Sequence, residues 1–170
     1  MNISIHNGRV IDPALGTDTI TDLFIADGHV VAQGAAPGGF VAERRIDAAG
    51  LIVCPGLIDL SARVDPLGSE LLAAVASGIT TLACPPDTQA PLDEPGLAER
   101  LIESSAAHGL ARVLPVGALT QGLAGEKLAE LAVLAQAGCI AFSHGKQTIA
   151  DTQLLLHAMQ YASTFGYTIL

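Results

Sequence analysis

Polar residues that could do chemistry follow short apolar runs in the second part of the chain. They are Ser61, Arg63, Asp65, Asp87 and His144. Their side chains could supply a nucleophile, an ion pair, a general base or a metal ligand. If the apolar runs are neighbouring parallel strands, these side chains meet at the carboxyl edge of one sheet. We call these five positions the candidate site.

None of the five residues completes a catalytic or metal-binding set in the sequence. Ser61 has no histidine or lysine base beside it, so we interpret it as a small polar residue and not as a nucleophile. His144 could bind a metal ion, but a zinc site needs three or four ligands. Arg63 would repel a cation, because a guanidinium has no free lone pair and stays charged. We predict no catalytic, substrate-binding or metal-binding residue, and we hypothesise that Arg63 pairs with Asp65 or Asp87.

A repeated strand-and-helix pattern after Pro55 predicts the elements that position the candidate site. Glycines recur about every 30 residues, the length of one βα unit, and each lies between a helical pattern and a short apolar run. They are Gly78, Gly109, Gly138 and Gly166. Counted from Leu57, the pattern predicts five strands and four helices, about half of a (β/α)8 barrel.

Two segments, 128–135 and 155–162, have the apolar spacing of amphipathic helices. Asp151 is placed to cap the second of these helices, and Pro95 suits the first turn of another. Strands that are apolar on both faces and joined by helices predict a parallel sheet.

Residues 1–54 are expected to form a small antiparallel β unit. Short alternating apolar runs are separated there by turn signals such as Asp27-Gly28. The predicted fold class is therefore α/β, in which residues 1–54 form a β-sandwich portion and residues 55–170 form the first half of a (β/α)8 TIM-type barrel.

The predicted barrel is incomplete in this chain, and no helix follows its last expected strand, 167–170. A sheet with an unpaired apolar edge tends to aggregate unless something covers it. We expect the chain to be a fragment of a longer polypeptide, and the alternative is an obligate partner that completes the sheet.

Composition excludes several classes of protein. The chain has 170 residues, of which 50% are hydrophobic, and a formal net charge of -9. We therefore expect it to bind neither nucleic acid nor an anionic membrane surface. No apolar stretch reaches membrane-spanning length and no signal-peptide pattern is present, so we expect a cytoplasmic protein. Cys54, Cys84 and Cys139 are expected to be buried free thiols.

Several segments together resemble the dihydroorotases, which are cyclic amidohydrolases of the amidohydrolase superfamily. Residues 55–60, PGLIDL, resemble the first barrel strand of that family, where His-x-His follows. Residues 78–88 resemble its GGFTTVVCMPNT segment, and residues 8–13 resemble a strand of its N-terminal β-sandwich. The resemblance implies a TIM-type barrel joined to a composite β-sandwich domain.

The chain departs from the family pattern at the candidate site. Ser61 and Arg63 occupy the two histidine positions of His-x-His. Asp65 stands where active members have the arginine that holds the substrate carboxylate, and Asp87 stands where they have a substrate-contacting asparagine. His144 stands in place of an acidic run. The resemblance thus implies zinc in active relatives, whereas no cofactor is expected here.

The resemblance points most closely to a non-catalytic dihydroorotase homologue, or pseudo-dihydroorotase. Such homologues are structural partners of the aspartate carbamoyltransferase catalytic chain in bacterial de novo pyrimidine biosynthesis, so we expect an oligomer with that enzyme. Two alternatives stay open. One is an active metal-dependent cyclic amidohydrolase with an atypical metal site that uses His144, and the other is a truncated fragment without independent function.

Overall fold

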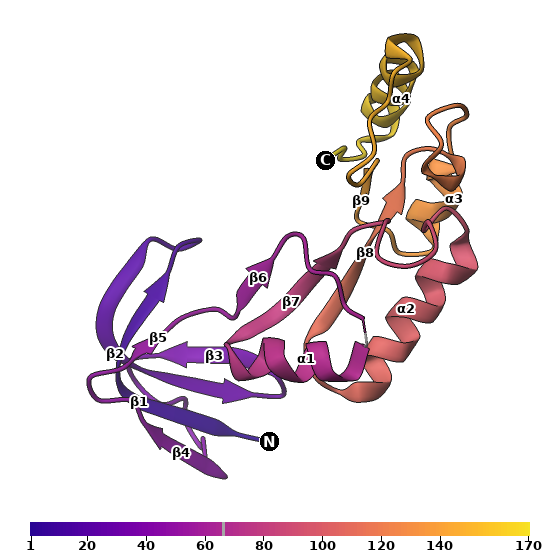
Figure 1. Ribbon diagram of the computed structural model, residues 1–170. Helices are drawn as coiled ribbons and strands as arrows, with labels where there is room; N and C mark the ends of the chain where they lie inside the picture. Colours follow the sequence, from indigo (N-terminus) through magenta and orange to yellow (C-terminus); the bar gives the residue numbers. More distant parts are fainter. Residues whose placement is uncertain (66) are drawn as a thin grey trace. The chain divides into compact units, whose positions relative to one another are not determined.

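The computed structural model describes residues 1–65 and 67–170. The chain divides into two compact units, Met1–Pro55 and Gly56–Leu170, which we describe one at a time (Figure 1). Among the described residues, none of the helices has the length and apolar character needed to cross a membrane.

The first unit is a five-stranded sheet with the order β3-β2-β1-β4, in which β5 also pairs with β1. Its strands are β1 (Ile3–Asp12), β2 (Thr17–Ala26), β3 (His29–Gln33), β4 (Arg44–Asp47) and β5 (Ile52–Val53). The first three strands are antiparallel, as the sequence predicts. However, β4 and β5 run parallel to β1, because the long connection 34–43 carries the chain past β1 to its other edge.

The turn between β2 and β3 shows why the sequence signal was informative. Asp27 and Gly28 have φ angles of 50° and 76°. Positive φ at both central residues is typical of the two-residue hairpin turn that matches the twist of the flanking strands.

The second unit is a parallel sheet with the order β6-β7-β8-β9 and helices between the strands (Figure 1). Its strands are β6 (Leu57–Asp59), β7 (Ile79–Cys84), β8 (Arg112–Ala118) and β9 (Ala141–Ser143). Its helices are α1 (Leu67–Ala76), α2 (Pro95–His108), the short 3-10 helix η1 (Gln121–Leu123), α3 (Leu131–Gln136) and α4 (Thr152–Phe165). The fifth expected strand is present only as a single parallel bridge between Phe142 and Ile169. The predicted fold class, a partial (β/α)8 barrel with a small β unit before it, is confirmed.

Helix ends in this unit follow the sequence signals closely. Pro95 is in the first turn of α2. The Asp151 side chain accepts hydrogen bonds from the backbone N–H groups of Gln153 and Leu154 at the start of α4. Gly109 and Gly166 end α2 and α4 in the left-handed conformation, which a residue with a Cβ adopts only at a cost.

The helix predicted from Leu128 is shorter than its apolar spacing indicated. Leu128 forms an isolated antiparallel bridge with Thr120, and α3 begins only at Leu131. A non-local backbone pairing therefore replaces the first helical turn.

The core of the second unit lies between the sheet and its helices. α2 packs on β8, and α1 packs on β7. Large side chains that are fully buried there include Leu71, Val113, Leu119, Leu134 and Phe142.

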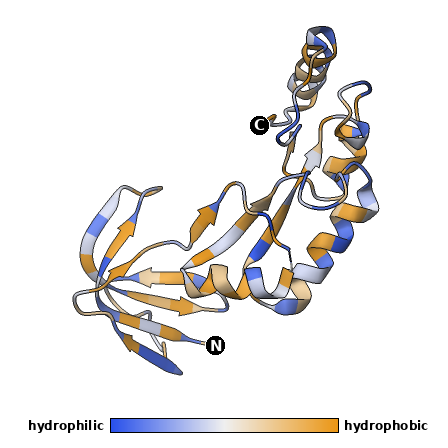
Figure 2. Cartoon of the chain, viewed as in Figure 1, coloured by the Kyte–Doolittle hydropathy of each residue, from blue (hydrophilic) through white to orange (hydrophobic). Residues whose placement is uncertain are grey.

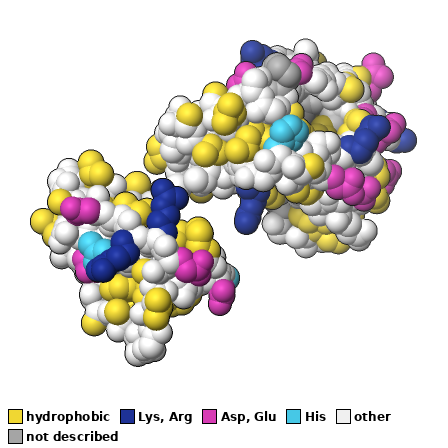
Figure 3. All heavy atoms as spheres, turned by 90° about the horizontal axis from the view of Figure 1, so that it is seen from below, with side chains coloured by type: hydrophobic (Ala, Val, Ile, Leu, Met, Phe, Trp, Pro, Cys, Tyr) yellow, Lys and Arg dark blue, Asp and Glu magenta, His cyan; other side chains and the backbone are white. Residues whose placement is uncertain are grey.

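Strand β6 forms one edge of the parallel sheet, and it is hydrophobic (Figure 2). Leu57, Ile58 and Leu60 are 57%, 62% and 74% exposed. Figure 3 likewise shows hydrophobic side chains on the visible surface of both units. A parallel sheet is ordinarily covered on both faces, so this edge has the character of an interior surface.

Of the three cysteines, Cys84 and Cys139 are buried free thiols, as expected, whereas Cys54 is exposed. The expectation for Cys54 was wrong because apolar neighbours in sequence do not ensure burial. Cys54 follows β5, a strand of only two residues, and of its two chain neighbours Pro55 is exposed and Val53 is half-buried.

Candidate functional site

The candidate site lies where the parallel strands end. Ser61 and Arg63 follow β6, and the backbone N–H of Ala62 between them donates to the carbonyl of Ala83 on β7 at 2.9 Å. Ala62 and Val64 pack in a hydrophobic cluster, whereas Ser61 and Arg63 are exposed. The alternation of an extended segment thus directs the polar side chains away from the core.

Arg63 forms an ion pair with Asp87, which follows β7. The guanidinium Nη2 donates to both carboxylate oxygens of Asp87, at 2.7 and 2.8 Å. Of the two partners considered for Arg63, Asp87 is therefore the one that the structure pairs with it. Asp65 is exposed. Ser61 is also exposed, and its backbone N–H donates to the Asp59 carboxylate at 2.9 Å.

Asp87 also contacts the segment that follows β9. The backbone N–H of Lys146 donates to its Oδ2 at 3.2 Å. Burial by itself would raise the pKa of Asp87, but the hydrogen bonds and charge of Arg63 and the Lys146 amide outweigh it and hold that pKa below its usual value. Asp87 is therefore a carboxylate at neutral pH.

His144 lies at the end of β9, where it is buried. Its Nδ1 is 3.3 Å from the hydroxyl of Thr120, and its Nε2 has no hydrogen-bond partner among the described residues. Burial lowers the pKa of His144 below its ordinary value, so the imidazole is neutral at pH 7. The structure does not bring His144 into contact with Arg63 by any hydrogen bond or ion pair among the described residues.

Thr120 is a site residue that sequence reasoning did not single out. It is fully buried after β8, and its hydroxyl accepts a hydrogen bond from the backbone N–H of Gly125 at 3.0 Å. The signal that could have found it is its position: it follows the apolar run of β8 just as His144 follows that of β9.

The residues present at this edge do not fit a zinc ion. Arg63 contributes a fixed positive charge, and both oxygens of Asp87 already accept hydrogen bonds from it. Within residues 1–65 and 67–170, no three His, Cys, Asp or Glu side chains gather in a way that could hold a metal ion. The arrangement favours an internal ion pair over cation binding.

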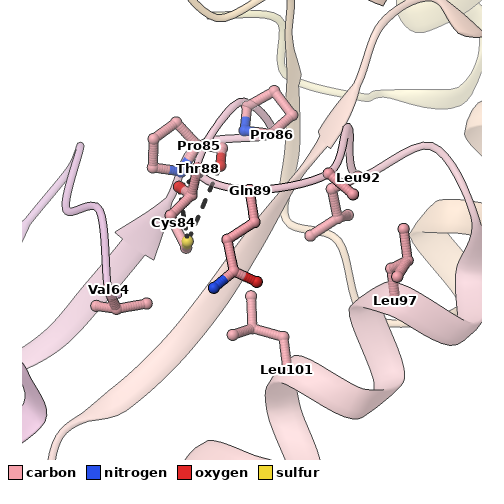
Figure 4. Close-up of a pocket in the computed structure, with 10 residues that line it drawn as sticks. Val64, Cys84, Pro85, Pro86, Thr88, Gln89, Leu92, Leu97 and Leu101 are labelled. Atoms are coloured by element: carbon pink, nitrogen blue, oxygen red, sulfur yellow. Dashed lines mark hydrogen bonds between the residues drawn. The ribbon is translucent and has the colours of Figure 1, made fainter. Parts of the chain in front are cut away.

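A small pocket of about 110 Å³ lies beside the end of β7 (Figure 4). Its walls come from the segment after β7, from α2 and from Val64, and none of the lining side chains is charged. Inside it, the thiol of Cys84 is 3.5 Å from the hydroxyl of Thr88. These residues do not extend the ion pair of Arg63, and the pocket is chiefly a gap in apolar packing.

Comparison with known proteins places the chain among related sequences. A family model described as dihydro-orotase-like matches residues 50–170. A dihydroorotase-like protein from Pseudomonas aeruginosa is 45% identical over 178 residues, covering 100% of this chain and 42% of that protein. A dihydroorotase from Citrifermentans bemidjiense is 39% identical over 181 residues, again covering 100% of this chain and 42% of that protein. The chain thus spans less than half the length of these relatives.

Comparison with solved structures gives the fold. The L-hydantoinase from Arthrobacter aurescens superimposes with a TM-score of 0.79 and 22% identity, covering 98% of this chain and 39% of that chain. At that identity the likeness concerns architecture alone.

Proposed function

Because the chain belongs to the dihydroorotase-like family of the amidohydrolase superfamily, we propose that it is part of a non-catalytic member of that family. We further propose that the protein acts in de novo pyrimidine biosynthesis, as a structural partner of the aspartate carbamoyltransferase catalytic chain. The proposed setting is an oligomeric assembly in the cytoplasm, without bound zinc.

The observation that carries the proposal is the ion pair between Arg63 and Asp87. The family pattern has zinc-binding histidines at the positions of Ser61 and Arg63. Neither a serine hydroxyl nor a guanidinium replaces a neutral imidazole as a zinc ligand. The ion pair also engages the carboxylate of Asp87, which stands where active family members have a substrate-contacting residue.

The relatives support the family membership from which this proposal proceeds. The Pseudomonas aeruginosa protein carries the name dihydroorotase-like protein, and it is more similar to this chain than the dihydroorotase from Citrifermentans bemidjiense. A barrel can keep its packed core and its surface after its active site has lost catalytic residues. Such a protein can still bind another protein through that surface.

Three measurements on the full-length protein test the proposal. We expect substoichiometric zinc by mass spectrometry, no hydrolysis of dihydroorotate above the buffer rate, and a larger complex when the protein sediments with the aspartate carbamoyltransferase catalytic chain. The Citrifermentans bemidjiense dihydroorotase provides the positive control for turnover. Stoichiometric zinc with turnover would contradict the non-catalytic assignment, and the absence of a complex would contradict the partner.

One observation favours the second candidate, an active cyclic amidohydrolase with an atypical metal site. The neutral, buried His144 has an Nε2 without a hydrogen-bond partner in the described part of the chain. Zinc titration of the full-length protein, followed by a panel of cyclic amides and ureides, tests this candidate. This candidate requires turnover that depends on zinc and is lost in His144→Ala. If the parent protein shows no turnover either with or without zinc, the candidate is excluded.

A further inference from the structure

We propose that the Arg63 guanidinium is a built-in cation that fastens the segments after β6, β7 and β9 to one another through the carboxylate of Asp87. We call this arrangement the Arg63–Asp87 clamp, and it comprises Arg63, Asp87, Gly145 and Lys146. The clamp holds the carboxyl edge of the sheet together, and it does not depend on the proposed partner.

The first part of the clamp joins the segments after β6 and β7. Arg63 Nη2 is within 2.8 Å of both oxygens of Asp87. The side chain of Arg63 is 36% exposed and that of Asp87 only 15%. Because the pair is partly shielded from water, its attraction is stronger than that of a pair on the open surface.

The second part joins Asp87 to the segment after β9. The Lys146 N–H donates to Asp87 Oδ2, which thus accepts from two segments at once. A charge-assisted hydrogen bond of this kind is stronger than one between neutral groups. Asp87 therefore connects two segments that lie 24 and 59 residues away from it in sequence.

The backbone after β9 is shaped around the carboxylate. Gly145 has a φ of +62°, and a Cβ at this position would lie 2.7 Å from the Asp87 carboxyl carbon. A side chain here would both strain the backbone and displace the carboxylate. The glycine thus permits the close approach that the Lys146 hydrogen bond requires.

The clamp has a consequence for charge. Without Arg63, Asp87 would be a half-buried carboxylate without its ion-pair partner, in a chain whose formal net charge is -9. Removing one partner of such a pair leaves the other uncompensated, so each partner depends on the other. In an active relative, by resemblance, metal-binding histidines stand at the positions of Ser61 and Arg63. Here Arg63 supplies a positive charge from within the chain.

A double-mutant cycle in the full-length protein tests the clamp. The variants are Arg63→Gln, Asp87→Asn and the two combined, and Arg100→Gln on the exposed face of α2 is the matched control. We expect each single variant to lower Tm by about 3–8 °C, and the double variant to lower it no further than the worse single one. Additive losses would contradict the coupling, and a loss in Arg100→Gln as large as in Arg63→Gln would contradict its location.

Hydrogen exchange supplies a local readout that a general loss of stability would not give. We expect the backbone N–H of Lys146 to exchange about tenfold faster in both single variants, while α2 exchanges as in the parent. Unchanged exchange at Lys146 would overturn the proposal. If Arg63→Gln does not fold, Arg63→Lys replaces it in the same measurement. Because Arg63→Lys keeps a positive charge at position 63, the Lys146 N–H in this variant should exchange at a rate closer to that of the parent than it does in Asp87→Asn. Equal acceleration in the two variants would contradict the role of the charge.

Discussion

At the scale of single residues, the candidate site divides into two clusters with different electrostatics. Arg63 and Asp87 form a charged pair that is partly open to solvent. His144 and Thr120 form a neutral, buried pair under the segment around Gly125. In the first cluster burial is compensated by an opposite charge, whereas in the second it keeps the imidazole uncharged.

The second cluster predicts a pH dependence of stability. The pKa of His144 is lower in the folded protein than its ordinary value of 6.5, because burial disfavours the charged form. As pH falls below 6.5, the unfolded chain therefore binds the proton more readily than the folded protein does. The free energy of unfolding decreases until the pH reaches the pKa of His144 in the folded protein. Above 6.5 this contribution is fully present.

Replacing His144 should remove that dependence. We expect the free energy of unfolding of His144→Gln, measured with urea at several pH values, to change less between about pH 7 and pH 5 than that of the parent. His157→Gln, at an exposed position of α4, is the matched control and should keep the parental slope. Parallel pH profiles for the parent and His144→Gln would refute the assignment. Asp87 does not confuse the result, since its pKa is lowered from 3.8.

At the scale of elements, strand ends bring the site together and helix ends set the lengths of the connections. β6 and β7 pair in parallel, with Asp59 opposite Leu82, so the segments that follow them emerge side by side. α4 follows β9 after a turn that includes Gly145, and Asp151 fixes its first residue. Local capping therefore determines how much chain is left to form the site.

The cap of α4 gives an element-scale prediction. Asp151 Oδ1 accepts from the N–H groups of Gln153 at 2.8 Å and Leu154 at 3.2 Å. Asp151→Ala should lower the free energy of unfolding by about 1 kcal/mol, because these two donors lose their partner. Asp151→Asn, which keeps a capping oxygen, should lose much less. Chemical denaturation measures both, and equal losses would show that the cap is not the cause.

At the scale of the whole molecule, the second unit is a sheet whose edge strand exposes apolar side chains. In the part of the chain that the structure describes, β6 pairs with β7 alone. On α4, Leu156, Met159 and Phe165 are also about half exposed. An uncovered apolar edge is a typical site of self-association.

A charge at this edge should therefore change solution behaviour more than stability. In the 170-residue chain, Leu60→Lys should reduce self-association measured by light scattering, with a change in unfolding free energy within about 0.5 kcal/mol, because Leu60 is 74% exposed. Val133→Lys on α3, where Val133 is 44% exposed, adds the same charge away from the edge. An equal reduction by both variants would point to net charge and not to the edge.

Much of the fold was predictable because its signals are local. The β-turn at Asp27-Gly28, the cap at Asp151 and the glycines that end α2 and α4 each depend on the conformational preference of one or two residues. The start of α3 was not predictable in this way, because Leu128 pairs with Thr120 across a loop. The parallel addition of β4 and β5 to β1 likewise depends on how a long connection crosses the sheet.

The sequence by itself determined which groups stand at the candidate site. Serine, arginine and aspartate at positions 61, 63 and 87 have their hydrogen-bonding and charge properties in any fold, so the misfit to zinc follows from residue type alone. Only the tertiary structure decided that Arg63 pairs with Asp87 and not with Asp65, that Lys146 joins them and that Thr120 holds His144. The physical reason is register: parallel pairing of β6 with β7 sets Asp87 beside Arg63 although 24 residues separate them, and no local preference encodes that proximity.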